Sequence, residues 1–140
     1  MTENKKIFLD TAPLIYFLDN NIHYAEKMMR IFDKILSENC SLVSSVITVE
    51  EYLVYPLRTN NQQKVSVFFD FTQDYGIDLI PVSLEIAKEA ARIRAEYSYF
   101  KSMDALQLAA AVESGCDMFL TNDKQLRQVN EIQVLLVDDL

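Results

Sequence analysis

Short apolar runs alternate with longer amphipathic stretches along this chain. Five runs have the length and composition of buried strands, at residues 5–10, 40–46, 78–82, 117–121 and 134–137. Helical stretches separate them, so we predict an α/β fold with a doubly wound, mainly parallel five-stranded sheet. Pro81 favours an edge position for the third strand, because proline cannot donate a ladder hydrogen bond.

The stretches between these runs show helical periodicity. Residues 24–37 carry apolar side chains at intervals of three and four, the stripe of a half-buried helix (Met28, Ile31, Phe32 and Ile35). Pro56 and the polar residues after it predict a break before a further helix around residues 65–71. The aromatic residues of that helix fit either an inward face with one exposed phenylalanine or a surface for a partner.

Capping signals place the helix starts more closely. Thr48 and Glu51 have the spacing of a capping box, which predicts that a helix begins at Thr48. Ser102 is predicted as the N-cap of a late helix rich in alanine and leucine, and Gly115 as the residue that ends it.

Length and composition fit one globular domain over residues 1–140, with half of the residues hydrophobic. No apolar run approaches the roughly 20 residues that a membrane span needs. The N-terminus turns acidic after a few apolar residues, so we expect no signal peptide, no membrane association and a cytoplasmic protein.

The formal net charge of −8 argues against a basic face that grips long nucleic acid. It leaves room for an enzyme acting on phosphodiesters, since divalent cations neutralise clustered carboxylates. The chain has few of the residues that other kinds of catalytic or binding site require. His23 is the single histidine, Cys40 and Cys116 lack zinc spacing, and two glycines cannot build a P-loop or a dinucleotide loop.

Four acids occupy comparable places relative to the predicted strands. Asp10 ends the first strand, Glu51 lies just after the second, Asp104 is in the first turn of the late helix, and Asp123 follows the fourth strand. Ligands of open α/β sheets bind at the carboxyl ends of the strands. If the first strand is central, these oxygen ligands converge there and suit Mg²⁺ or Mn²⁺.

Each acid also has a purely structural interpretation. Asp10 fits a strand-end turn, Glu51 a capping box, Asp104 a favourable charge at a helix N-terminus, and Asp123 an N-cap. Four acids at one predicted edge favour a shared site, and a helical acid can both cap and bind.

The chain resembles the PIN domain family, and within it the VapC-like ribonuclease toxins. Four segments carry the resemblance, in family order and spacing: FLDTAPLIYFLD, SVITVEEYL, MDALQLAAA and FLTNDKQL. They contain Asp10, Glu51, Asp104 and Asp123 in turn. Glu50 is the one register alternative, and the spacing from Thr48 favours Glu51.

The resemblance implies a three-layer α/β/α fold with strand order 3-2-1-4-5. It also implies Mg²⁺- or Mn²⁺-dependent cleavage of RNA, with Asp10, Glu51, Asp104 and Asp123 as metal-binding and catalytic residues. We expect Asp10 and Asp104 to be direct ligands, because they come from the most rigid elements. Glu51 and Asp123 would act through water or orient the nucleophile.

Partners follow from the same resemblance and from the charge. We expect an RNA substrate, a small antitoxin with a basic or apolar tail, and a homodimer. The alternative is a catalytically silent PIN-like module that only binds a protein, and a metal titration distinguishes the two.

Overall fold

Five parallel strands form the centre of the molecule. The structure, a computed structural model, describes residues 3–140. The strands are β1 (Lys6–Leu9), β2 (Ser41–Ser45), β3 (Asp78–Ile80), β4 (Met118–Thr121) and β5 (Gln133–Leu136). They pair in the order β3-β2-β1-β4-β5, and every pairing is parallel. The predicted fold class and strand order are therefore confirmed, with β1 central and β3 at an edge.

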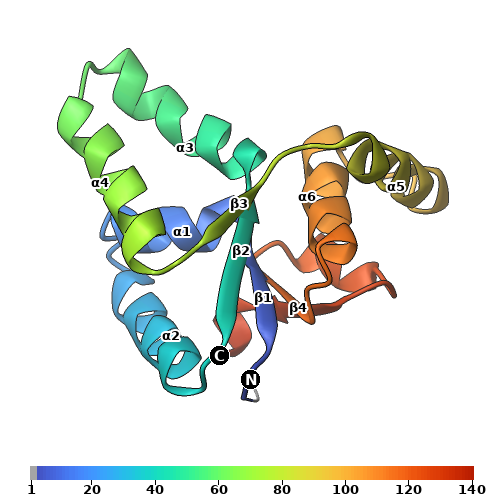
Figure 1. Ribbon diagram of the computed structural model, residues 1–140, viewed down its shortest axis with the longest axis horizontal. Coiled ribbons are helices and arrows are strands. Elements are labelled where there is room, and N and C mark those ends of the chain that lie inside the picture. Colours follow the sequence, from blue (N-terminus) through green and yellow to red (C-terminus); the bar gives the residue numbers. More distant parts are fainter. Residues whose placement is uncertain (1–2) are drawn as a thin grey trace.

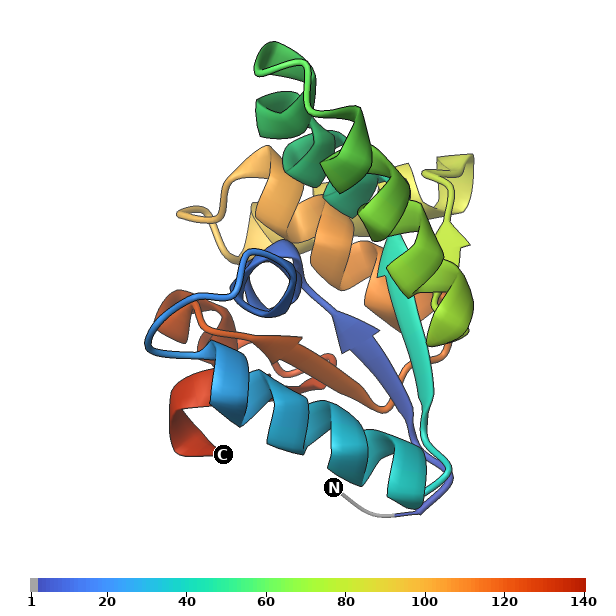
Figure 2. The ribbon, with the colours of Figure 1, turned by 90° about the vertical axis from the view of Figure 1, so that its left-hand side faces the viewer.

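Helices connect the strands and cover both faces of the sheet (Figure 1). They are α1 (Thr11–Leu18), α2 (Ala25–Ser37), α3 (Val46–Arg58), α4 (Gln62–Asp74), α5 (Leu84–Glu96) and α6 (Ser102–Glu113), with short 3₁₀ turns η1 (Lys124–Gln128) and η2 (Val137–Asp139). Helices α1, α2 and α4 lie on one face, and α5 and α6 on the other (Figure 2). This is the predicted three-layer α/β/α arrangement. None of the helices within residues 3–140 combines the length and apolar composition that a membrane crossing requires.

The two faces of the sheet bury different kinds of side chain. Strand β1 alternates, with Ile7 and Leu9 on the α1–α2–α4 side and Phe8 on the α5–α6 side. The first core is rich in aromatic rings, including Phe32, Phe68 and Phe71. The second contains a run of alanines from α6, whose small side chains let α5 and α6 pack closely.

Two predicted helix starts are wrong. The N-cap of α3 is Ser45, whose hydroxyl accepts a hydrogen bond from the Ile47 N–H at 3.1 Å, so Thr48 is not the cap. The strand end supplies a hydroxyl one turn earlier, and Thr48 turns into the interior instead. Ser102 is the first residue of α6, and its N-cap is Lys101.

Other boundary predictions fare better. Gly115 follows α6 with φ of +73°, the left-handed conformation expected of a residue that ends a helix. Pro56 lies inside α3, which continues for two residues before the predicted break. In α4, Phe68 and Phe71 are buried while Phe69 is 44% exposed, which matches an inward face with one exposed ring.

Candidate active site

The fold brings the four predicted acids to one edge of the sheet. Asp10 follows β1, Asp123 follows β4, Glu51 lies in α3 after β2, and Asp104 lies in the first turn of α6. Helices α1, α3 and α6 all begin near the carboxyl ends of the central strands (Figure 2). The negative charges of Glu51 and Asp104 act on Asp10, and those of Asp123 and Glu51 act on Asp104. The four therefore form one electrostatic cluster.

Asp10 is the most tightly fixed of the four. Its Oδ1 accepts a hydrogen bond from the Thr11 N–H at 2.9 Å, which makes Asp10 the N-cap of α1. Its Oδ2 accepts from the Thr121 hydroxyl at 2.8 Å, and the Gln107 amide lies 3.4 Å from Oδ1. Both carboxylate oxygens are thus held in place from three different elements.

Burial and neighbouring charge destabilise the ionised forms of two of these acids. Desolvation raises the pKa of Asp10 from 3.8 to about 6, with smaller increases from Asp104 and Glu51 and opposing hydrogen bonds from Thr121 and Thr11. Desolvation also raises the pKa of Asp104, with a further increase from Asp123 that Lys101 partly offsets. A positive ion at this edge would relieve both effects.

A buried network of polar side chains lies next to the acidic cluster and is linked to it by hydrogen bonds. The Gln107 amide donates to the Thr48 hydroxyl at 2.8 Å, and its carbonyl oxygen accepts from the Ser45 hydroxyl. Thr48 also lies 2.9 Å from the Ser44 hydroxyl and 3.1 Å from the Thr11 hydroxyl. Strand β2 and helices α1, α3 and α6 are thereby joined through side chains alone.

This network reaches Glu51 through Thr11. The Thr11 hydroxyl donates to Glu51 Oε1 at 2.7 Å, while the Thr11 N–H binds Asp10. Thr11 therefore sets the relative positions of two acids that lie about forty residues apart in sequence. Glu51 remains exposed beyond this contact.

Asp123 is held on the opposite side of the cluster. Its N–H donates to the Thr121 hydroxyl at 3.2 Å, and its Oδ1 accepts from the Gln125 N–H at 3.0 Å, so it caps η1 as predicted. Asn122 points elsewhere, because its Oδ1 accepts from the Asp138 N–H at 3.1 Å. Of the polar pair in this loop, Thr121 supports the acids and Asn122 anchors the C-terminal turn.

The buried polar network, formed around Gln107, is not predicted from the sequence as part of a site. Gln107 is 2% exposed in an otherwise apolar helix face, and a lone polar residue in such a face was the available signal. Ser44 and Ser45 end an apolar strand, a second such signal. Thr48 was assigned to a capping box that does not form.

The donor set suits a divalent cation. All four side chains offer carboxylate oxygens, the ligands that Mg²⁺ and Mn²⁺ prefer, and no histidine lies among them. Among residues 3–140, no three acidic, histidine or cysteine side chains are gathered tightly enough to enclose an ion. Because like charges repel, ligation would draw these carboxylates together as a cation offsets their charge.

Solved structures of similar fold include several VapBC chains. VapBC2 from Rickettsia felis, bound to a fragment of promoter DNA, has a TM-score of 0.76 at 17% identity over 94% of this chain and 98% of that chain. DNA-bound VapBC from Salmonella typhimurium has a TM-score of 0.75 at 19% identity, over 98% and 99% of the two chains. VapC20 from Mycobacterium tuberculosis, a toxin that cleaves the sarcin–ricin loop, has a TM-score of 0.67 at 14% identity, over 91% and 98%.

Two further comparisons use the sequence alone, one with curated proteins and one with models of protein families. No curated protein matches the chain at a significant level. The model of the PIN domain matches residues 7–132, which span β1 through the loop before β5 and include all four acids. This chain belongs to the PIN domain family.

Proposed function

We propose that this protein is a divalent-metal-dependent endoribonuclease whose site comprises Asp10, Glu51, Asp104 and Asp123. The observation that carries the proposal is the convergence of four carboxylates at the carboxyl edge of a PIN sheet, where two of them have a raised pKa. Carboxyl groups whose pKa is raised by burial and by neighbouring charges are typical of functional sites.

The four acids have different surroundings and would have different roles. Asp10 and Asp104 are partly buried, so they would hold a cation at fixed positions. A bound Mg²⁺ or Mn²⁺ would lower the pKa of a water molecule and offset charge on the phosphate. Glu51 and Asp123 are exposed and would orient the attacking water, with either carboxylate able to accept its proton.

The toxin assignment rests on similar structures and on charge. Those structures include a toxin–antitoxin complex from Klebsiella pneumoniae with a TM-score of 0.71 at 20% identity, over 94% of this chain and 97% of that chain. With a net charge of −8, this chain suits a small antitoxin whose basic or apolar tail covers the acidic edge. We also infer a homodimer as the working form, which sedimentation of the purified protein would test.

The decisive experiment combines a metal titration with RNA cleavage. Wild type should bind Mn²⁺ in calorimetry, cleave RNA when Mg²⁺ or Mn²⁺ is present, and stop in excess chelator. Asp10→Asn should lose both binding and cleavage while keeping its circular dichroism spectrum. Asp70→Asn, an exposed acid on α4, is the matched control and should behave as wild type.

Two outcomes would contradict the proposal. Cleavage that persists in excess chelator would exclude the metal mechanism. A protein that binds no Mn²⁺ and cleaves no RNA would instead be the silent protein-binding module.

A further inference from the structure

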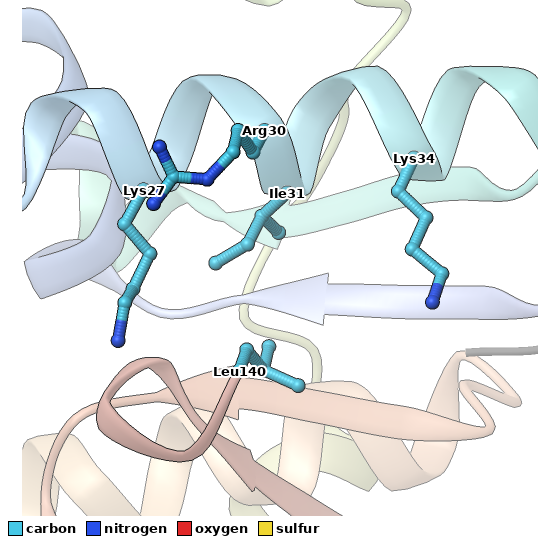
Figure 3. A pocket seen from close by; sticks show the side chains of 5 residues that line it. All are labelled: Lys27, Arg30, Ile31, Lys34 and Leu140. Carbon is cyan, nitrogen blue, oxygen red and sulfur yellow. The ribbon is translucent and has the colours of Figure 1, made fainter.

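A basic groove lies between α2 and the C-terminal turn, apart from the acidic cluster. Its volume is about 260 Å³, and its lining residues are Lys27, Arg30, Ile31, Lys34 and Leu140. Figure 3 shows the three cationic side chains coming from α2, with Leu140 facing them across the groove. Ile31, buried in the core, supplies part of an apolar floor.

The positive charge of this groove is only weakly neutralised. Lys27 Nζ donates to the carbonyl oxygens of Val137 and Asp138 at 3.2 and 3.4 Å, which are uncharged acceptors. Lys34 Nζ lies 3.9 Å from the partly buried Glu38 carboxylate, while within residues 3–140 Arg30 forms no ion pair. Three cations thus share one groove in a chain of net charge −8.

Two acids of the C-terminal turn, next to Leu140, are engaged elsewhere. The Asp138 carboxylate accepts from the Tyr24 hydroxyl at 2.8 Å. The Asp139 carboxylate pairs with Arg127 at 3.1 Å. Asp138 still interacts electrostatically with Lys27, and Lys34 pairs with Glu38, so the least neutralised cation of the groove is Arg30.

A short chain of contacts joins the groove to the acidic cluster. Lys27 binds the carbonyl of Asp138, and the N–H of Asp138 donates to Asn122, the neighbour of Asp123. Asn122 also donates to the Tyr16 hydroxyl at 3.4 Å, and Tyr16 stacks on Tyr24 at 4.2 Å between centroids. A strand that leaves the cluster past Asp123 would therefore meet an aromatic pair and then the groove.

We propose that this groove is an RNA-binding subsite that holds backbone phosphates beyond the bond to be cleaved. The inference rests on the proposed function, because it assigns the groove to the same substrate. Lys27, Arg30 and Lys34 form one stripe about 10 Å long on α2, which suits a strand that carries a charge on every residue. Ile31 and Leu140 offer apolar contact to a base or sugar. Continuity with the acidic cluster favours RNA over an acidic peptide.

The test compares two double variants that remove the same charge. R30Q/K34Q changes the groove and leaves Lys27, which ties α2 to the C-terminal turn, in place. K88Q/R94Q changes two exposed cations on α5 and is the matched control. A third variant, R30K/K34R, keeps the charge of the groove.

Binding is measured first, in chelator, as the anisotropy of a labelled single-stranded RNA of about twenty nucleotides over a range of salt. R30Q/K34Q should bind about 5–10-fold more weakly at low salt, and its salt dependence should be shallower by about 1.4 in slope. K88Q/R94Q and R30K/K34R should match wild type. Equal binding by R30Q/K34Q and wild type, or an equal loss in K88Q/R94Q, would overturn the proposal.

Cleavage is measured next, with Mn²⁺. R30Q/K34Q should raise KM for the long RNA by a similar factor, with kcat unchanged and a tetranucleotide cleaved as by wild type. An equal loss on the tetranucleotide would overturn the subsite, as would weakened binding of polyglutamate with unchanged RNA binding. If no RNA is cleaved but the anisotropy difference holds, the nuclease assignment fails and the groove stands.

Discussion

The two halves of the acidic cluster differ in how the fold treats them. Asp10 and Asp104, the inner pair, are partly buried and have a raised pKa. Glu51 and Asp123, the outer pair, are exposed. The fold therefore destabilises the ionised inner acids and leaves the outer acids in water.

The difference indicates which acids a bound cation would stabilise most. A desolvated carboxylate is costly unless a positive charge faces it, while an exposed one is stabilised by solvent. The inner pair is thus suited to direct ligation at fixed positions. The outer pair can adjust to substrate and water.

The largest expected effect separates the pairs by activity. Asp10→Asn and Asp104→Asn should each lower the rate of RNA cleavage by about a thousandfold, because each removes a direct charge contact to the cation. Glu51→Gln and Asp123→Asn should lower it by about 10–100-fold, the usual range for a group that acts at second hand. Single-turnover rates with saturating Mn²⁺ measure this.

Asp70→Asn, an exposed change on α4, serves as the control for these rates. Equal losses in the inner and outer pairs would contradict the distinction between them. The four acids would then act as one unit.

The network beneath the inner pair should matter for stability. Gln107→Ala removes the partner of the Ser45 and Thr48 hydroxyls and leaves a small cavity, which should lower the free energy of unfolding by about 2–3 kcal/mol. Urea denaturation measures the loss. Gln73→Ala, an exposed change on α4, should stay within about 0.5 kcal/mol of wild type.

Such a loss would show that the hydrogen bonds of Gln107 stabilise the fold around Asp10. A Gln107→Ala protein as stable as wild type would show instead that these hydrogen bonds contribute little to the free energy of unfolding. In that case the position of Asp10 would depend on its hydrogen bonds with Thr11 and Thr121.

These positions mark how far the sequence can predict the molecule. The apolar runs predict the strands of the sheet, because the alternation of buried side chains is a local feature of each strand. The position of each acid relative to these runs predicts the edge at which it lies. The capping interpretation of Thr48 failed, since its partners Thr11 and Gln107 lie 37 and 59 residues away. The neighbouring sequence shows that a hydroxyl could cap a helix, but it does not show that the hydroxyl will instead form a hydrogen bond with a distant side-chain amide.

The dependence of stability on pH should reveal the raised pKa of Asp10. The pKa of Asp10 rises from 3.8 to about 6 on folding, so protonated Asp10 favours the folded state. This contribution is fully present below pH 4 and is lost as the pH rises toward 6. In chelator, Asp10→Asn should therefore gain stability over wild type as the pH rises from 4 through 6, reaching about 3 kcal/mol by pH 7.

Urea unfolding of both proteins across this range gives the difference. Asparagine keeps an acceptor for the Thr11 N–H but loses the one for the Thr121 hydroxyl, a change that does not depend on pH. The pH dependence of the difference therefore reports the charge. A difference that stays constant from pH 4 to 7 would mean that Asp10 is not strained. Near neutral pH, added Mg²⁺ should raise the stability of wild type and so reduce its difference from Asp10→Asn.

The smallest expected effect concerns Asp123, where a metal role and a capping role make opposite predictions. Asp123 raises the pKa of Asp104, so its charge opposes ionisation of that member of the inner pair. Asp123→Asn keeps the cap on Gln125 and removes that repulsion, so the metal-free variant should be more stable by about 1 kcal/mol or less. Wild type should gain about 2.7 kcal/mol from Mg²⁺ at a hundred times its dissociation constant, and the variant much less. Thermal melts with and without Mg²⁺ measure both. If the variant is less stable without Mg²⁺ and responds to it as wild type does, Asp123 is a helix cap and the outer pair is reduced to Glu51.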